Sequence, residues 1–254
     1  MQSRTRNYRQ IHEASELLWE KLGMLNAQQR QSFDEKLMMS WIYHDFALEG
    51  TVLTVAEIKA AVDPEIISSS SLIPAYDHII AVGEGIRYIL DHREDRIFLS
   101  LDWLKKIYQL LLPAGKKDQV QYRKDNPIHR MYFHDLAAAD KISYRMRKLT
   151  DWFRTEECRK AHPVELATEI HRELIRIFPW PDISGRVARL VMNAILVSED
   201  YWPGLIHAVD RHNYYDVLRL DQDQLLNLVV DAMEEGIRSA NRLYQQIVDA
   251  SRGF

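Results

Sequence analysis

Apolar residues recur at three- and four-residue spacing along most of the chain, which is the period of a helix with one buried face. The clearest case is residues 163–177, where one face collects Val164, Ala167, His171, Leu174 and Ile175 and is continued by Phe178. The final stretch, residues 223–249, repeats the pattern with Leu226, Val229, Val230, Met233, Ile237 and Leu243. The same spacing predicts helices at about 75–92, 100–112, 139–157, 163–177, 185–197, 211–219 and 223–249.

Residues that favour helix ends support several of these boundaries. Gly50 fits the C-cap of a helix that includes Leu37, Trp41 and Ile42. Thr54 and Glu57 have the spacing of a capping box, which predicts a helix from about 54 to 62. Pro163 suits a first helical turn, where its missing N–H has no partner to lose.

Residues 113–133 do not follow the helical period. A Pro113-Ala-Gly115 turn is followed by two short β-prone runs, Val120–Arg123 and Arg130–Phe133, around Asn126-Pro127. We therefore expect an all-α fold with one small β-hairpin flap. The expected organisation is a helical arm at 1–34, a main domain at 35–220 and a C-terminal helix at 221–254 packed on the same domain.

Composition narrows the class of protein. The 254 residues carry a formal net charge of −4, which argues against a general nucleic-acid binder. The single cysteine, Cys158, cannot form an internal disulfide, and the polar start shows no signal-type apolar core. No stretch approaches the about 18 apolar residues of a membrane-spanning helix. These features predict a cytoplasmic protein that does not enter a membrane.

A candidate anion site lies where Pro179 and Pro181 break one helix and another begins near Gly185. Arg186 and Arg189 lie three residues apart on that second helix, and amides at a helix N-terminus attract anions. Asp182 in the loop has the oxygen ligands that a divalent cation bridging phosphates requires. The spacing is also consistent with a helix–loop–helix whose surface arginines are paired to carboxylates.

The segment Phe178-Pro-Trp-Pro-Asp182-Ile-Ser184-Gly185-Arg186-Val-Ala-Arg189 resembles the core motif of the Fic (Fido) family, His-Pro-Phe-x-Asp/Glu-Gly-Asn-Gly-Arg-x-x-Arg. The likeness covers roughly residues 35–220. Family members typically move AMP from ATP to a protein hydroxyl. The resemblance implies that Asp182 binds Mg²⁺, that Ser184, Gly185, Arg186 and Arg189 hold the phosphates of ATP, and that Tyr122 and Arg123 belong to a flap that aligns the target.

Three residues depart from that motif. Phe178 stands at the position of the catalytic histidine and cannot accept a proton; a positioned general base is worth about 10²–10⁴-fold in rate. Ile183 replaces a glycine and avoids positive φ, and Ser184 replaces an asparagine. His171 lies about 10 Å from this position along the helix axis, at about 1.5 Å per residue. His129 and His134, near the flap, are the other candidates for a substitute base.

An upstream segment, Asp45-Phe-Ala-Leu-Glu49-Gly50, is similar to the inhibitory helix of Fic proteins, Ser/Thr-x-x-x-Glu-Gly/Asn. The resemblance implies that Glu49 pairs with Arg189 and blocks the seat of the γ-phosphate. Asp45 stands where Ser or Thr is expected.

Three functions stay open on the sequence. The first is a degenerate Fic protein that is weak or inactive in AMP transfer but binds ATP with Mg²⁺. The second is an active nucleotidyl- or phosphoryl-transferase with a non-standard base. The third is a helical protein-interaction module that binds no nucleotide. The partner is an unidentified target protein, and similarity to Fic proteins adds the expectation of a homodimer.

Overall fold

The computed structural model describes residues 7–63, 65–66, 68, 73, 75–125, 136–220 and 222–252. Within this part of the chain every regular element is helical. The α-helices are α1 (Tyr8–Gly23), α2 (Ala27–Leu48), α3 (Val55–Val62), α4 (Tyr76–Asp91), α5 (Leu101–Leu110), α6 (Ile142–Phe153), α7 (Glu156–Lys160), α8 (Pro163–Ile177), α9 (Ser184–Ser198), α10 (Arg211–Val217) and α11 (Gln222–Arg252). Three short 3₁₀ turns lie at Ala114–Lys116, Ala139–Lys141 and Ala208–Asp210.

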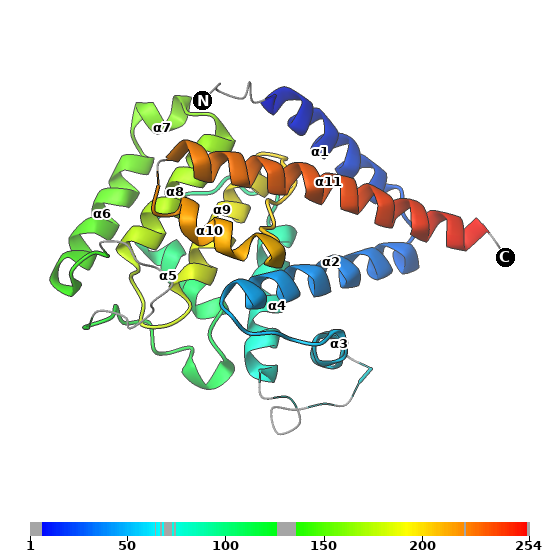
Figure 1. Ribbon diagram of the computed structural model, residues 1–254, viewed down its shortest axis with the longest axis horizontal. Coiled ribbons are helices and arrows are strands. Elements are labelled where there is room, and N and C mark those ends of the chain that lie inside the picture. The colour runs from blue at the N-terminus through cyan, green and yellow to red at the C-terminus, as the bar shows by residue number, and fades with distance from the viewer. Residues whose placement is uncertain are drawn as a thin grey trace.

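Helix α9 is the centre of the bundle. Every residue from Ser184 to Val197 is buried, so this helix has no solvent-facing side. It packs against α8, α4 and α5, while α10 and α11 cross in front of it (Figure 1). A helix that is enclosed all round places whatever lies at its N-terminus in a fixed position relative to its neighbours.

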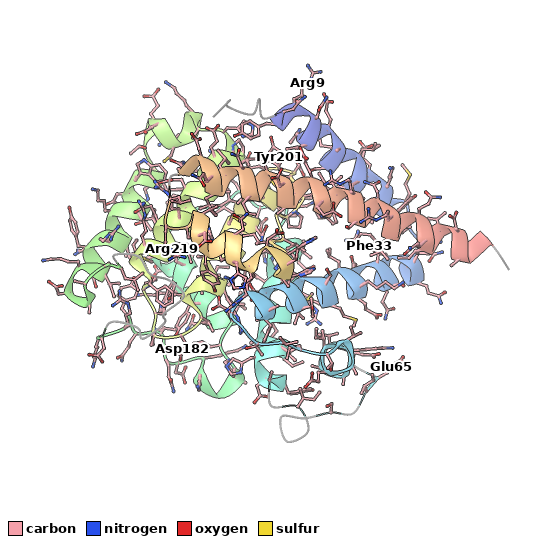
Figure 2. The ribbon with its side chains drawn as sticks, viewed as in Figure 1. Arg9, Phe33, Glu65, Asp182, Tyr201 and Arg219 are labelled. Atoms are coloured by element: carbon pink, nitrogen blue, oxygen red, sulfur yellow. The ribbon has the colours of Figure 1, made fainter. Side chains whose placement is uncertain are left out.

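Helices α1, α2 and α11 extend together to one side of the bundle (Figure 1). Phe33 of α2 is fully buried and faces α11 (Figure 2). Near the far end of this group, the Gln29 side-chain amide donates to Ser251 Oγ at 2.8 Å. Helix α2 is continuous through residue 34, where we predicted the end of an arm. Its other end reaches the candidate site with Asp45 and Glu49.

The predicted all-α class is confirmed, and most helix boundaries agree within a few residues. Thr54 and Glu57 form the predicted capping box, and Pro163 occupies the first turn of α8. The predicted helix at 139–157 is divided at Arg154, because Thr155 caps a new short helix, α7. None of the described helices combines the length and apolar character needed to cross a membrane.

The predicted hairpin flap is not confirmed. Residues 119–123 form no strand, and the second run, with His129 and His134, lies outside the described residues. The serine run at 68–71 also falls largely outside them.

Candidate functional site

The corner between α8 and α9 is set by two residues in left-handed backbone conformations. Phe178, the C-cap of α8, has φ +46°, and Ile183, the N-cap of α9, has φ +51°. For a β-branched residue such as Ile183 this conformation costs about 1–2 kcal/mol. The strain expected from isoleucine at a glycine position of the motif is therefore present in the folded chain.

Two polar side chains secure this strained corner. The buried Arg123 guanidinium donates to the carbonyl of Phe178 at 2.7 Å and also to those of Ile177 and Ala137. Its backbone N–H donates to Pro179 O at 2.9 Å. Ser184 Oγ accepts from the Trp180 N–H and donates to Trp180 O, both at 2.9 Å. Arg123 thus satisfies carbonyls that the end of α8 leaves open, and Ser184 closes the loop.

Aromatic packing holds the same loop from the other side. Trp180 is buried and stacks on Tyr108 with ring centroids 4.5 Å apart. Tyr122 lies 6.2 Å from Trp180, centroid to centroid. The two residues that we predicted to align a target are therefore both in contact with the corner, Tyr122 through its ring and Arg123 through its guanidinium.

Both motif arginines are buried and face carboxylates from the end of α2. Arg189 places Nε 2.7 Å from Asp45 Oδ1 and one terminal nitrogen 2.7 Å from Glu49 Oε1. Arg186 Nε lies 3.3 Å from Asp45 Oδ2, with its guanidinium 3.9 Å from the centre of the Phe46 ring. The contact between Glu49 and Arg189 that the sequence suggested is present. The role of Asp45, which joins both arginines, was missed because the resemblance led us to expect a hydroxyl residue there.

The pairing of Arg186 is geometrically incomplete. Arg186 Nε and Asp45 Oδ2 are both buried, yet neither makes a hydrogen bond with a described residue, because their contact lacks the required geometry. A buried donor without an acceptor costs about 1–3 kcal/mol. The ion pair therefore leaves Arg186 with capacity to bind a better-aligned anion.

A cavity of about 850 Å³ lies in front of Arg186, at the N-terminal end of α9; Arg189 does not line it, whereas its partner Glu49 does. Its walls include Glu49, His78, Lys116, Phe178, Asp182 and Arg186. Phe178 is 4% exposed and takes the place in the wall where the motif has a histidine. Asp182 is exposed at the edge of the bundle (Figure 2).

The described residues contain no group of three or more His, Cys, Asp or Glu suited to a resident metal ion. Mg²⁺ usually binds through about one or two carboxylates together with substrate phosphates. The exposed Asp182 carboxylate fits that arrangement, in which the ion arrives with a nucleotide.

Two histidines near the site differ in their access to the cavity. His171 is fully buried and lies 3.0 Å from Tyr214 Oη through Nε2. Burial first, and then the charge of Arg189, lowers the pKa of His171 to about 3. His171 is therefore a core residue and is closed off from a substrate. His78 of α4 is half-buried and lines the cavity, and the sequence pattern gave no sign of it.

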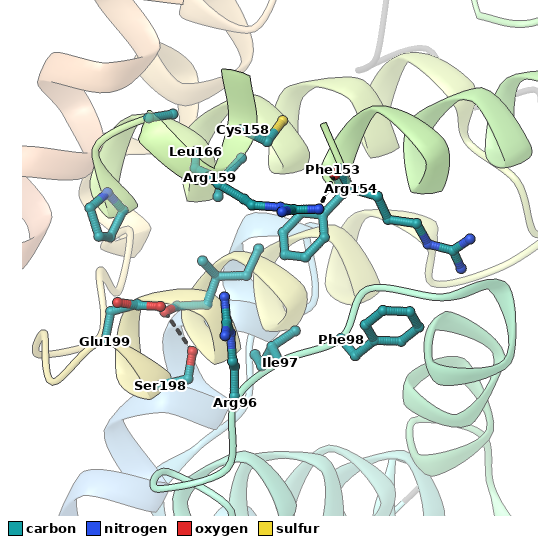
Figure 3. Close-up of a pocket in the computed structure, with 13 residues that line it drawn as sticks. Arg96, Ile97, Phe98, Phe153, Arg154, Cys158, Arg159, Leu166, Ser198 and Glu199 are labelled. Carbon is teal, nitrogen blue, oxygen red and sulfur yellow. Dashed lines mark hydrogen bonds between the residues drawn. The ribbon is translucent and has the colours of Figure 1, made fainter. Parts of the chain in front are cut away.

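A second cavity, of about 600 Å³, lies between the 96–98 segment, α7 and the end of α9. The guanidinium groups of Arg96 and Arg159 extend toward it (Figure 3). Cys158 also lines it, but burial raises the pKa of this thiol, which keeps it protonated and poorly nucleophilic. This cavity therefore presents cationic side chains but, among the described residues that line it, no reactive nucleophile, in contrast to the cavity at the α8–α9 corner.

Comparisons with known proteins point to one family. Residues 98–196 match the model of the Fic/DOC family. The chain is 29% identical over 181 residues to a protein adenylyltransferase Fic of Nematostella vectensis, covering 70% of this chain and 42% of the relative. It is 27% identical over 195 residues to one of Culex quinquefasciatus, covering 74% and 37% respectively. The chain thus spans about two fifths of the length of these curated relatives.

Solved structures show the same fold. A Fic domain-containing signaling protein from Bacteroides thetaiotaomicron superposes with a TM-score of 0.71 at 22% identity, covering 96% of this chain and 98% of that one. Fic-1 from C. elegans gives 0.70 at 19% identity, covering 96% and 73%. The helical bundle therefore has the fold of the Fic domain, and the match of residues 98–196 together with these relatives and structures supports a Fic (Fido) family protein.

Proposed function

We propose that this chain binds ATP with Mg²⁺ in the cavity at the N-terminus of α9 and that its chemistry is AMP transfer to a protein hydroxyl, weakened or lost through Phe178. The observation that carries the proposal is the buried Arg186 at the cavity, with the buried Arg189 one turn further along α9, both facing carboxylates from the end of α2. The relatives named protein adenylyltransferase Fic support the substrate class.

The arginines would bind the phosphates of the nucleotide. Both guanidinium groups are already buried, so little further desolvation accompanies anion binding. Amides of the first α9 turn, at Ser184 and Gly185, add donors that face an anion. Asp182 would hold the Mg²⁺ ion, which would neutralise phosphate charge during the transfer.

Glu49 would act as an inhibitory residue. It occupies Arg189 at 2.7 Å, so a phosphate that needs the same guanidinium must displace this carboxylate. Asp45 makes a second contact of the same kind. We expect both carboxylates to reduce the affinity for ATP.

Phe178 determines how much chemistry remains. A phenyl ring cannot take the proton of an attacking hydroxyl, and its loss as a base corresponds to about 10²–10⁴-fold in rate. Tyr122 and Arg123 would still position a target segment beside the corner. The alternatives are an active transferase that uses another base and an interaction module whose cavity binds no nucleotide.

Calorimetry with ATP-Mg tests the binding step. We expect measurable binding that becomes tighter in Glu49→Gly, with Glu13→Gly, which removes an exposed carboxylate within α1, as a control. If neither the wild type nor Glu49→Gly binds ATP at millimolar concentration, the nucleotide-binding functions are excluded, and only the protein-interaction module remains.

Incubation with labelled ATP tests the transfer step. Phe178→His in the Glu49→Gly background is expected to create or raise labelling. A double variant that binds ATP without labelling would assign the defect to Ile183 and Ser184 in place of Phe178.

A further inference from the structure

The wall of the ATP cavity contains a histidine that the Fic motif does not supply. His78 lies in the first turns of α4, distant in sequence from the α8–α9 corner, and borders the same cavity as Phe178, Asp182 and Arg186. Its ring makes no hydrogen bond or ion pair with another described residue that would commit it to a structural role. Helix α4 packs directly on α9, so the position of His78 relative to the corner is fixed by the core.

The charge state of His78 suits proton acceptance. Burial, followed by the charges of Arg186 and Lys116, lowers its pKa below the ordinary 6.5, and Asp77 and Asp182 oppose this shift. The imidazole is therefore neutral near pH 7 and has a free nitrogen lone pair. The cations that lower the pKa are the same groups that line the cavity and would face phosphates.

We infer that His78 takes the proton from the attacking target hydroxyl, in place of the histidine that Phe178 has displaced. This inference rests on the ATP site proposed above. In the step, the hydroxyl O–H bond breaks and its proton passes to an imidazole nitrogen of His78. The oxygen forms a bond to the α-phosphorus of ATP, and the bond from that phosphorus to the bridging oxygen breaks. Pyrophosphate leaves with the electron pair.

The test measures labelling and ATP binding in variants that lack Glu49, or both Asp45 and Glu49, so that these carboxylates no longer occupy the arginines. His78→Gln is introduced into Glu49→Gly and into Asp45→Ser/Glu49→Gly, and each protein is incubated with labelled ATP-Mg. We expect the rate constant for labelling at saturating ATP to fall at least about a hundredfold. The Kd for ATP should stay within about threefold. His92→Gln, at the other end of α4, is the matched control, because His92 lies beside a different cavity and should leave the rate unchanged.

The pH profile separates proton acceptance from a packing role. In Glu49→Gly and in Asp45→Ser/Glu49→Gly, the rate constant for labelling should rise with pH through one titration and then level off, because protonated His78 cannot accept a proton. The residual labelling rate of the His78→Gln variants should not show this rise with pH.

Other outcomes overturn the inference in distinguishable ways. An unchanged rate in His78→Gln, or a loss explained by a higher Kd for ATP, would show that His78 is not the acceptor. ATP binding without labelling in both parent variants, Glu49→Gly and Asp45→Ser/Glu49→Gly, would refute the inference and leave the nucleotide site standing. No ATP binding in either parent would refute the proposed function itself.

Discussion

Asp45 offers the sharpest test of how this site is held together. Its carboxylate contacts Arg189 at 2.7 Å and Arg186 at 3.3 Å, and all three side chains are at most 8% exposed. Asp45→Asn keeps the shape and removes the charge. Breaking a buried pair by neutralising one partner costs about 3–5 kcal/mol, because the other charge stays buried.

The matched control is Glu49→Gln. Glu49 is more exposed, at 16%, and Arg189 keeps Asp45 when Glu49 is neutralised. Loss of the charged Glu49–Arg189 contact should lower the free energy of unfolding by about 1.5–3 kcal/mol, the size of one hydrogen bond to a charged group. For a chain of this size about 1 kcal/mol corresponds to about 2–4 °C in Tm. We therefore expect Asp45→Asn to lower Tm by about 6–20 °C and Glu49→Gln by clearly less.

The decisive assay is thermal unfolding with and without pyrophosphate-Mg. Pyrophosphate supplies the negative charge that Asp45→Asn removes, so it should raise the Tm of this variant more than that of the wild type. Two results would refute the reasoning: a loss of stability in Asp45→Asn no larger than in Glu49→Gln, or equal stabilisation of both proteins by pyrophosphate. Either would mean that the arginines do not depend on this carboxylate as a counter-charge.

Three further predictions concern the surroundings of the site. Arg123→Met should lower the free energy of unfolding by at least about 3 kcal/mol in urea, because it removes several hydrogen bonds from a charged donor to carbonyls near the end of α8. Ile183→Gly should change stability by less than about 1 kcal/mol, since relief of the +51° φ offsets the lost side-chain contacts, and calorimetry should show tighter ATP binding. The folded pKa of His171 lies below its unfolded value, so its contribution to stability is full above pH 6.5 and falls as the unfolded chain takes up a proton. At about pH 5 the loss is about 2 kcal/mol, at about 1.4 kcal/mol per pH unit, and urea titrations of His171→Gln should lack it.

The sequence predicted the elements whose ends carry a local signal. Thr54 with Glu57 and Pro163 mark helix starts through contacts within one turn, so their boundaries agreed with the structure. Phe178 and Ile183 could be identified as unusual because the motif gives a reference for each position.

Residues whose role depends on tertiary packing could not be found in this way. Asp45 was treated as a weak match to a hydroxyl residue, although the fold gives it contacts with two arginines. His78 has no neighbouring sequence signal, and only the packing of α4 on α9 brings it to the cavity. Arg123 was assigned to a flap, and its burial against the end of α8 depends on packing between residues 55 positions apart in the sequence, which no local pattern encodes.

The left-handed backbone at Phe178 has a consequence for how this position can change. The conformation is imposed by the end of α8 and by the hydrogen bond from Arg123 to the Phe178 carbonyl, and the phenyl ring does not determine it. Histidine is enriched at positive φ, and bulky residues such as phenylalanine are disfavoured there. The scaffold is therefore better suited to the residue it lacks than to the one it has. An exchange between the two would therefore change the side chain that lines the cavity while leaving the architecture in place, at little folding cost.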